Sequence, residues 1–150
     1  MNIRIDRRQL LRGLLAVGAM ATWPVQLLAR NTSAFKATAE AEALTALYGD
    51  KAVRESAEIQ LKVPEIAENG SVVPVTVSTT LPGVVGISII VAENPNPLSA
   101  RFQFAGGVAP DISTRLKMGK SSDVIAAVET ADAVLIARKN VKVTIGGCGG

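Results

Sequence analysis

The feature that most constrains the fold of this chain is a series of short apolar runs separated by turn-forming residues. Between residues 59 and 145, valine, isoleucine and leucine alternate with polar residues, and proline, glycine or asparagine punctuates the runs. Side chains of a strand point alternately to its two faces, so this alternation predicts half-buried strands about 8 to 12 residues apart. Such spacing is typical of a small antiparallel β-sandwich.

The runs differ in how they are expected to be buried. Residues 86–92 are almost continuously apolar, which predicts a strand covered on both faces, whereas residues 124–128 fit either a strand or a helical turn. The only tryptophan, Trp23, lies near the N-terminus, so the sandwich would lack the buried tryptophan and the disulfide of immunoglobulin domains. The other predicted strands are 59–63, 73–77, 101–104, 112–116, 133–137 and 141–145.

A helical pattern precedes these strands. Residues 34–48 are rich in alanine, glutamate and leucine and end before Gly49, a suitable C-cap. A second helical turn is predicted around residues 50–58, where charged side chains recur every three or four positions. We therefore expect a mainly β fold, an immunoglobulin-like antiparallel β-sandwich preceded by one or two N-terminal helices.

The first 29 residues have the pattern of an export signal. Arg7 and Arg8, followed by two leucines and Arg12, form a twin-arginine motif, and residues 13–29 are mostly apolar. This run is shorter than the roughly 20 apolar residues of a membrane-spanning helix, which predicts cleavage near Ala29. The alternatives are an ordinary secretory signal and an uncleaved anchor. The predicted location is the periplasm, reached by the twin-arginine route.

Removing this signal leaves a chain with no net charge. Residues 1–29 hold four arginines and one aspartate, so 12 basic and 12 acidic residues remain. Without a cluster of basic residues, nucleic acid is not expected as a partner, and no membrane association is expected after cleavage. The predicted organisation is a signal peptide (1–29), an N-terminal helical segment (30–58), a β-sandwich (59–145) and a glycine-rich arm (146–150).

The only cysteine, Cys148, lies two residues from the C-terminus among glycines. It has no second cysteine with which to form a disulfide inside the chain. Because glycine-rich segments resist fixed structure, the thiol is expected to be presented on a flexible arm, roughly 10 Å beyond Ile145. The alternative is a frayed tail with an incidental cysteine. The arm residues are Gly146, Gly147, Gly149 and Gly150.

The composition excludes much of the usual catalytic chemistry. The chain contains no histidine, the commonest general base and metal ligand, and its carboxylates form no pair spaced for acid–base work. We therefore expect no catalytic residue, no metal site and no cofactor. The terminal carboxylate near Cys148 opposes thiolate formation, so activation of the thiol must come from another protein.

The C-terminal residues 141–150 closely resemble the end of the SoxY family, the sulfur-carrier subunits of the bacterial thiosulfate-oxidising Sox system. Residues 64–70 leading into 72–75, and residues 92–97, resemble the same family, so the resemblance covers essentially the whole chain after the signal. It implies that Cys148 holds thiosulfate-derived and persulfide-type sulfur covalently while separate enzymes load, hydrolyse and oxidise it. The carrier itself would catalyse nothing.

The resemblance also implies partners. The first is SoxZ, a sandwich-type subunit without an export signal, which could form a heterodimer with this chain and travel with it through the twin-arginine route. Transient partners would be the haem protein SoxAX, which loads thiosulfate, the sulfate-releasing hydrolase SoxB and the sulfane-oxidising SoxCD. Whether two heterodimers pair through Cys148 stays open.

Two other classes of function remain as alternatives. A structural sandwich module would use Cys148 for an intermolecular disulfide. A thiol oxidoreductase with its own turnover is disfavoured, because the chain lacks both a histidine and a second cysteine.

Overall fold

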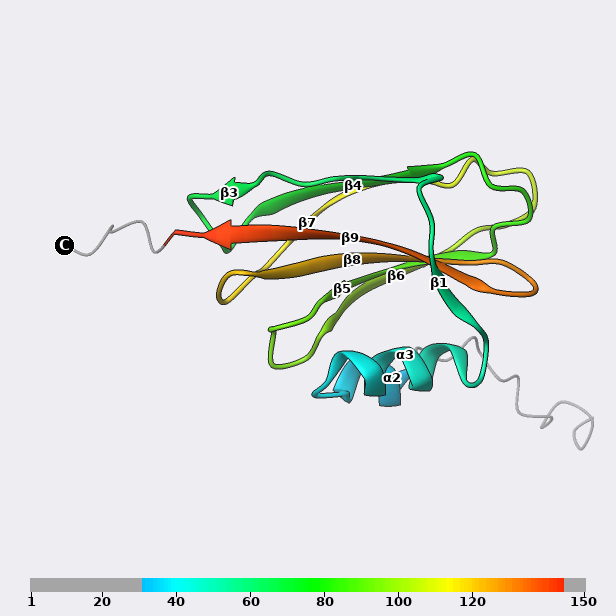
Figure 1. Cartoon of the computed structure of the whole chain (residues 1–150), viewed down its shortest axis with the longest axis horizontal. Helices are drawn as coiled ribbons and strands as arrows, with labels where there is room; N and C mark the ends of the chain where they lie inside the picture. Colours follow the sequence, from blue (N-terminus) through cyan, green and yellow to red (C-terminus); the bar gives the residue numbers. More distant parts are fainter. Residues whose placement is uncertain (1–30, 145–150) are drawn as a thin grey trace, which may run out of the picture. The chain divides into compact units, whose positions relative to one another are not determined.

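Two β-sheets pack face to face in the computed structural model, which describes residues 31–144 (Figure 1). The larger sheet has the order β1-β9-β8-β5-β6, with β3 also paired to β9, and the smaller sheet has the order β2-β4-β7. The strands are β1 (Val53–Glu55), β2 (Ile59–Lys62), β3 (Ile66–Ala67), β4 (Val73–Thr79), β5 (Gly86–Val91), β6 (Leu98–Gln103), β7 (Asp111–Leu116), β8 (Ser122–Glu129) and β9 (Val134–Val143). The predicted mainly β sandwich is confirmed.

The inner core between the sheets follows from the alternation in the sequence. In β4, Val73, Val75 and Val77 are fully buried, while Thr76 and Ser78 point away from the core. The inward side chains of β5 and β8 complete this core from the larger sheet. Burial of these aliphatic side chains is the main force that holds the two sheets together.

Strand β5 explains the continuous apolar run at residues 86–92. Ile87, Ile89 and Val91 face the inner core, whereas Ile90 packs against the helices on the outer face of the larger sheet. Every residue of β5 is buried, as the sequence predicts. The same two-sided burial occurs in β8, so residues 124–128 form a strand and not a helical turn.

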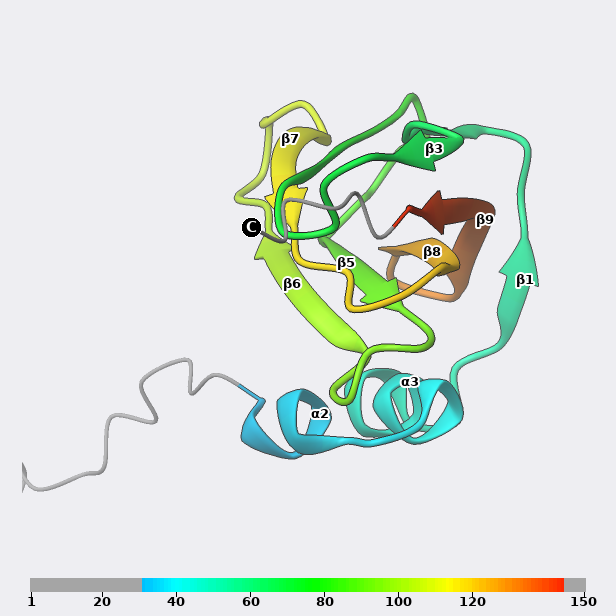
Figure 2. The same cartoon turned by 90° about the vertical axis from the view of Figure 1, so that its left-hand side faces the viewer.

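The helices that cover the larger sheet are α2 (Thr32–Lys36) and α3 (Glu40–Tyr48) (Figure 2). The single helix predicted over residues 34–48 is wrong, because the chain is extended at Ala37 and the Glu42 carboxylate accepts the backbone N–H of Thr38 at 2.9 Å. The break folds α2 back beside α3, where the Asn31 amide donates to the Ala46 carbonyl at 2.7 Å. Helix α3 ends before Gly49, whose φ is 60°, as expected for a C-cap.

Strand β9 is a single strand where the sequence predicts two. Arg138, Lys139 and Asn140 lie between the two predicted strands 133–137 and 141–145, but β8 pairs with β9 without interruption from Val134 to Val141. The polar side chains in this middle section are exposed, and Arg138 contacts Glu40 of α3 and Asp123 of β8. The long side chains of arginine and lysine keep their charged ends in water, so this part of β9 can stay paired in the sheet while its outer face is exposed.

Two short strands beside β9 are absent from the sequence prediction. Residues 53–55, placed in a helical turn by their charge spacing, instead form β1 and pair in parallel with residues 134–136 of β9, so that prediction is wrong. Ile66 and Ala67 form β3, which pairs in parallel with Lys142 and Val143. Both pairings join residues far apart in the sequence, which local patterns do not reveal. No helix within residues 31–144 is long and apolar enough to span a bilayer.

The sandwich has two ends with different loops. We call the end at which β9 finishes the arm-root end, because the predicted arm follows it; the loops 68–72, 92–97 and 117–121 lie there. The antiparallel registers place the loops 80–85 and 104–110 at the opposite, remote end. Figure 1 shows β3 and β9 pointing together towards the arm-root end.

Candidate functional site

The residues predicted to carry function lie outside the described residues. These are the signal residues Arg7 and Arg8, the attachment residue Cys148 and the arm glycines Gly146, Gly147, Gly149 and Gly150. The structure instead describes the root of the arm, the last residues of β9 up to Thr144 and the loops around them. How firmly this root is held determines how well the base of the arm is positioned.

Backbone hydrogen bonds hold the end of β9 on both sides. On the β3 side, Lys142 N–H donates to the Glu65 carbonyl at 2.9 Å and Thr144 N–H donates to the Ala67 carbonyl at 3.1 Å. On the other side, Val143 N–H donates to the Ser121 hydroxyl at 2.9 Å. The chain is therefore fixed in place as far as Thr144.

A close backbone contact at Gly70 also supports the end of β9. The chain turns at Asn69-Gly70, with Ser71 N–H donating to the Asn69 side chain at 2.9 Å. Met118 N–H donates to the Gly70 carbonyl at 2.6 Å. A Cβ at position 70 would collide with the Met118 carbonyl oxygen and would lie 2.9 Å from Cγ1 of Val143. Only glycine fits between the 117–121 loop and the end of β9.

Two asparagines of the 92–97 loop brace the same end. Asn94 donates to the Lys117 carbonyl at 2.7 Å and accepts from Gly119 N–H at 3.1 Å, which fixes the 117–121 loop. Asn96 donates to the Ala37 carbonyl between the two helices at 3.3 Å. Both asparagines belong to the stretch 92–97 that resembles the SoxY family; Asn94 positions the 117–121 loop beside the end of β9, and Asn96 ties the 92–97 loop to the segment between the helices.

The surface of the arm-root end mixes charge with exposed apolar side chains. Lys120 and Glu93 form an ion pair at 2.8 Å, with both side chains largely exposed. Ile66 is 58% exposed and Val72 is 48% exposed. The sequence alone did not point to Ser121, whereas Ile66 and Asn94 lie in the stretches 64–70 and 92–97 that resemble the SoxY family. Among residues 31–144, no group of three or more acidic, cysteine or histidine residues is placed to hold a metal.

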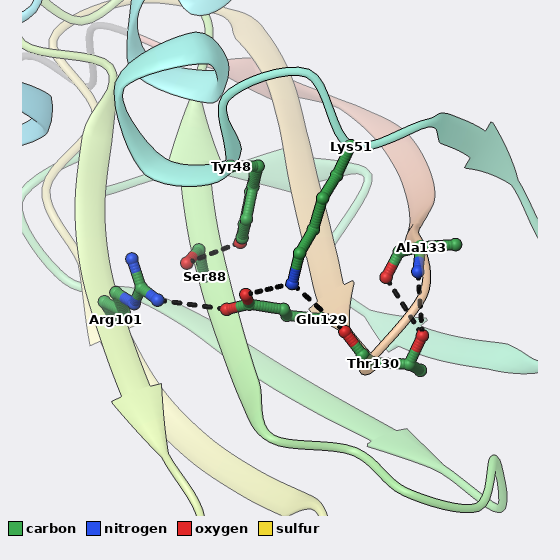
Figure 3. Close-up of polar contacts among 7 residues, drawn as sticks. All are labelled: Tyr48, Lys51, Ser88, Arg101, Glu129, Thr130 and Ala133. Atoms are coloured by element: carbon green, nitrogen blue, oxygen red, sulfur yellow. Dashed lines mark hydrogen bonds and ion pairs between the residues drawn. The ribbon is translucent and has the colours of Figure 1, made fainter.

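A second polar cluster lies beneath the C-terminal end of α3. Figure 3 shows Tyr48 directed at Ser88 of β5, with Arg101 and Lys51 on either side of Glu129. The Tyr48 hydroxyl donates to the Ser88 hydroxyl at 2.8 Å, and Arg101 lies 5.8 Å from the centre of the tyrosine ring. Glu129 accepts from Lys51 at 2.8 Å and from Arg101 at 3.0 Å. We call these five residues the Tyr48 cluster.

The burial of the Tyr48 cluster indicates a structural role. Tyr48 is 6% exposed and Ser88 is 1% exposed, so a substrate has no access to their hydroxyls. Burial raises the pKa of Tyr48, an effect opposed by the hydrogen bond with Ser88 and by the charge of Arg101. The Glu129 side chain is only 14% exposed, and two cations neutralise its carboxylate.

Comparisons with known proteins relate both the sequence and the β-sandwich fold of this chain to one family. The chain matches the family model described as sulfur oxidation protein SoxY over residues 44–148, a range that includes Cys148. It is similar to the solved structure of the sulfur carrier protein SoxY from Chlorobium limicola f thiosulfatophilum, at 40% sequence identity and a TM-score of 0.65. This similarity covers 70% of this chain and 96% of that chain. No curated protein matches the sequence.

Proposed function

This chain belongs to the SoxY family of sulfur oxidation proteins, and on that premise we propose that it carries sulfur intermediates bound covalently to Cys148. The observation that carries the proposal is the family match, which extends to the only cysteine of the chain. A lone thiol close to the C-terminus is accessible to the active sites of other proteins. The chain serves as the shared substrate of several enzymes and has no turnover of its own.

The anchored end of β9 supports this role. Thr144 is held by β3 through its backbone, and Cys148 follows four residues later. At 3.3 to 3.6 Å per residue, Cys148 can lie up to about 14 Å from Thr144. A rigid base followed by a short glycine-rich segment delivers a thiol into a narrow active site without unfolding any part of the sandwich.

Loading of this thiol is an oxidation. A bond forms between the Cys148 sulfur and the outer sulfur of thiosulfate, and one proton and one electron pair leave. The electron pair is accepted by a separate haem protein of the SoxAX type. Hydrolysis of the terminal sulfonate by a SoxB-type enzyme then releases sulfate and leaves a persulfide on Cys148, which a SoxCD-type enzyme oxidises. A SoxZ-like subunit forms the permanent heterodimer with this chain.

The covalent role is tested by intact-mass spectrometry of the protein from cells grown on thiosulfate. Sulfane and sulfonate adducts are expected on the wild-type chain and absent from Cys148→Ser. A control with Thr144→Ser keeps the hydroxyl group beside Ala67 and should carry the same adducts as the wild type. A wild-type thiol that is never modified would contradict the proposal.

The structural alternative makes a different prediction. If Cys148 formed a permanent intermolecular bridge, non-reducing electrophoresis would show a constant disulfide-linked dimer whether or not thiosulfate is supplied. A carrier instead shows a monomeric band whose adducts depend on the sulfur source.

The periplasmic location is tested through Arg7 and Arg8. Replacing both by lysine should keep the precursor in the cytoplasm, because the twin-arginine route requires the paired guanidinium groups. Cell fractionation followed by immunoblotting measures the distribution. Normal export of this variant would show that the protein uses another export route. The covalent role of Cys148 would still be decided by the adduct measurement.

A further inference from the structure

The last residues of β9 extend beyond the strand that pairs with them on one side. The final pair of the β8–β9 ladder is Ser122 with Val141, and a ladder reaching Val143 would need β8 to begin two residues earlier. The chain instead bends through residues 117–121 before β8 begins. The acceptor for the Val143 N–H is the Ser121 hydroxyl, at 2.9 Å. One side chain thus replaces the missing backbone acceptor beyond the end of the ladder.

Ser121 is itself held in place on both sides along the chain. Met118 is 3% exposed, and its N–H donates to the Gly70 carbonyl. Ser122 is also 3% exposed, and its hydroxyl accepts the Glu93 N–H at 3.0 Å. The side chain of Ser121 lies at the surface between these two buried neighbours. Its hydroxyl therefore meets β9 at a position fixed by the surrounding packing.

On its other side, the end of β9 is held by a very short strand. Lys142 and Thr144 donate their backbone N–H groups to carbonyls beside and within β3. Strand β3 has only two residues, and one of them, Ile66, is 58% exposed. Strand ends that bury little surface are among the first parts of a fold to open. The Ser121 hydroxyl therefore supplies a large share of what holds residues 142–144.

The position at which β9 opens determines how far the thiol can lie from the folded backbone. Four residues, 145–148, follow Thr144 up to and including Cys148, which allows a separation of up to about 14 Å. If β9 opened back to Val141, the segment 142–148 would have seven residues and a reach of about 25 Å. A longer segment lowers the effective concentration of the thiol at an active site. It also adds three residues that must be ordered whenever the arm enters an enzyme.

We infer that Ser121 is a positioning residue for the carrier reaction: its hydroxyl holds the end of β9, so that the arm begins after Thr144. This inference rests on the proposed function, which supplies the enzymes that receive Cys148. It adds a residue outside the arm that determines how readily those enzymes take up the arm. Ser121 acts through the backbone of Val143 and takes no part in the chemistry at sulfur.

The experiment measures sulfate release by the SoxB-type hydrolase of the same organism. The varied substrate is the thiosulfate-loaded complex of the mature chain with its SoxZ-like subunit. Ser121→Ala should raise KM at least about twofold and leave kcat unchanged, because hydrolysis occurs at the sulfur after the arm has entered. Hydrogen exchange at the Val143 amide, measured by NMR, should become about fivefold faster.

Two further variants separate the hydroxyl of Ser121 from general effects of substitution. Ser121→Thr keeps the hydroxyl acceptor and should have the wild-type KM and the wild-type exchange at Val143. The matched control is Ser113→Ala, which removes a hydroxyl 3.0 Å from the Thr76 hydroxyl on the smaller sheet and should change neither quantity. Ser121 and Ser113 both avoid the buried core, and circular dichroism checks that each variant is folded.

Unchanged KM in folded Ser121→Ala would overturn the inference, even with faster exchange at Val143, because the held strand end would then not matter to the enzyme. A lower kcat at unchanged KM would overturn it too, and so would a Ser121→Thr variant that behaves like Ser121→Ala. Failure of the proposed function looks different: the hydrolase would release no sulfate from the wild-type carrier, and the inference would fall with it.

Discussion

The two ends of the sandwich are built on different principles. At the arm-root end, Gly70, Asn94 and Ser121 hold three chain segments together with close backbone contacts and side-chain hydrogen bonds. At the remote end, the loops 80–85 and 104–110 are short turns whose glycines have no atom close to an added Cβ. The first end fixes one strand terminus through these contacts, and the second consists of turns whose glycines make no such contacts.

This difference shows how a carrier can be rigid where its arm begins without making its whole surface rigid. Substitutions at the arm-root end should disturb folding, because atoms there are in van der Waals contact or hydrogen-bonded. A substitution at Gly106 in the remote loops, where an added Cβ meets no atom, should leave folding unchanged. The following experiments test that contrast.

The largest effect is expected for Gly70→Ala. The added Cβ would collide with the Met118 carbonyl oxygen and press on Val143, so the backbone must move. We expect the free energy of unfolding to fall by about 2 to 4 kcal/mol, measured by urea denaturation. The control Gly106→Ala, with no atom within 4 Å of the new Cβ, should change it by less than about 0.5 kcal/mol. Equal effects of the two substitutions would remove the contrast between the ends.

The next effect concerns the Tyr48 cluster, which fastens α3 to the sheet. Tyr48→Phe removes the hydrogen bond to Ser88, whose hydroxyl is 1% exposed, and should cost about 1 to 2 kcal/mol of stability. Adding Ser88→Ala to Tyr48→Phe should recover part of this loss, because the buried hydroxyl without a partner is then removed as well. A double variant less stable than the single one would contradict this account.

The same cluster predicts a pH dependence. Because the pKa of Tyr48 is raised above 10.0, the folded chain keeps its tyrosine proton where the unfolded chain has lost it. The stabilisation from this group is therefore complete below pH 10.0 and is lost as the pH rises towards the folded-state pKa. Tyr48 is the only tyrosine, so tyrosinate absorbance reports this residue alone. A titration midpoint below that of free tyrosine would refute the burial argument.

A smaller effect is expected for Asn94→Ala. The substitution leaves the Lys117 carbonyl and the Gly119 N–H without their side-chain partner, at a partly exposed position where water can replace it. We expect a loss of about 1 kcal/mol and faster hydrogen exchange at the Gly119 amide, measured by NMR. Unchanged exchange at Gly119 would mean that Asn94 does not brace the loop.

The smallest effect is expected for Lys120→Ala. The ion pair with Glu93 has side chains 63% and 55% exposed, so solvent screens most of the attraction. Thermal unfolding should change by an amount equivalent to less than about 0.5 kcal/mol. A larger loss would show that charge, and not close packing, holds the arm-root end.

Much of this architecture is visible in the sequence. The alternating valines of β4 and the continuous apolar run of β5 predict strands with one and two buried faces, because burial follows directly from side-chain period. The break between α2 and α3 is not visible, since alanine and glutamate favour a continuous helix, and the break depends on the packing of α2 beside α3 and on the hydrogen bond from Thr38 N–H to Glu42. Strand β1 is not visible for a similar reason: its partner in β9 is far away in the sequence.

For the candidate site, the sequence predicts the functional residues but not the residues that support them. Cys148, its glycines and the signal motif of Arg7 and Arg8 are predicted from the sequence, and they remain predictions because they lie outside the described residues. The supports of the arm root, Ser121 and Asn94, are not predicted, because a serine or asparagine in a loop has many equivalent uses. Their role depends on which backbone groups the fold brings within hydrogen-bonding distance.

The sequence by itself determined which residues can be buried and which chemistry is available, because side-chain period and composition are local properties. It therefore specified a sandwich with a single thiol and no histidine. The tertiary structure alone decided that β9 is one strand held as far as Thr144, and that Gly70, Asn94 and Ser121 meet around its end. Both depend on contacts between distant segments, whose geometry exists only once the sheets have packed.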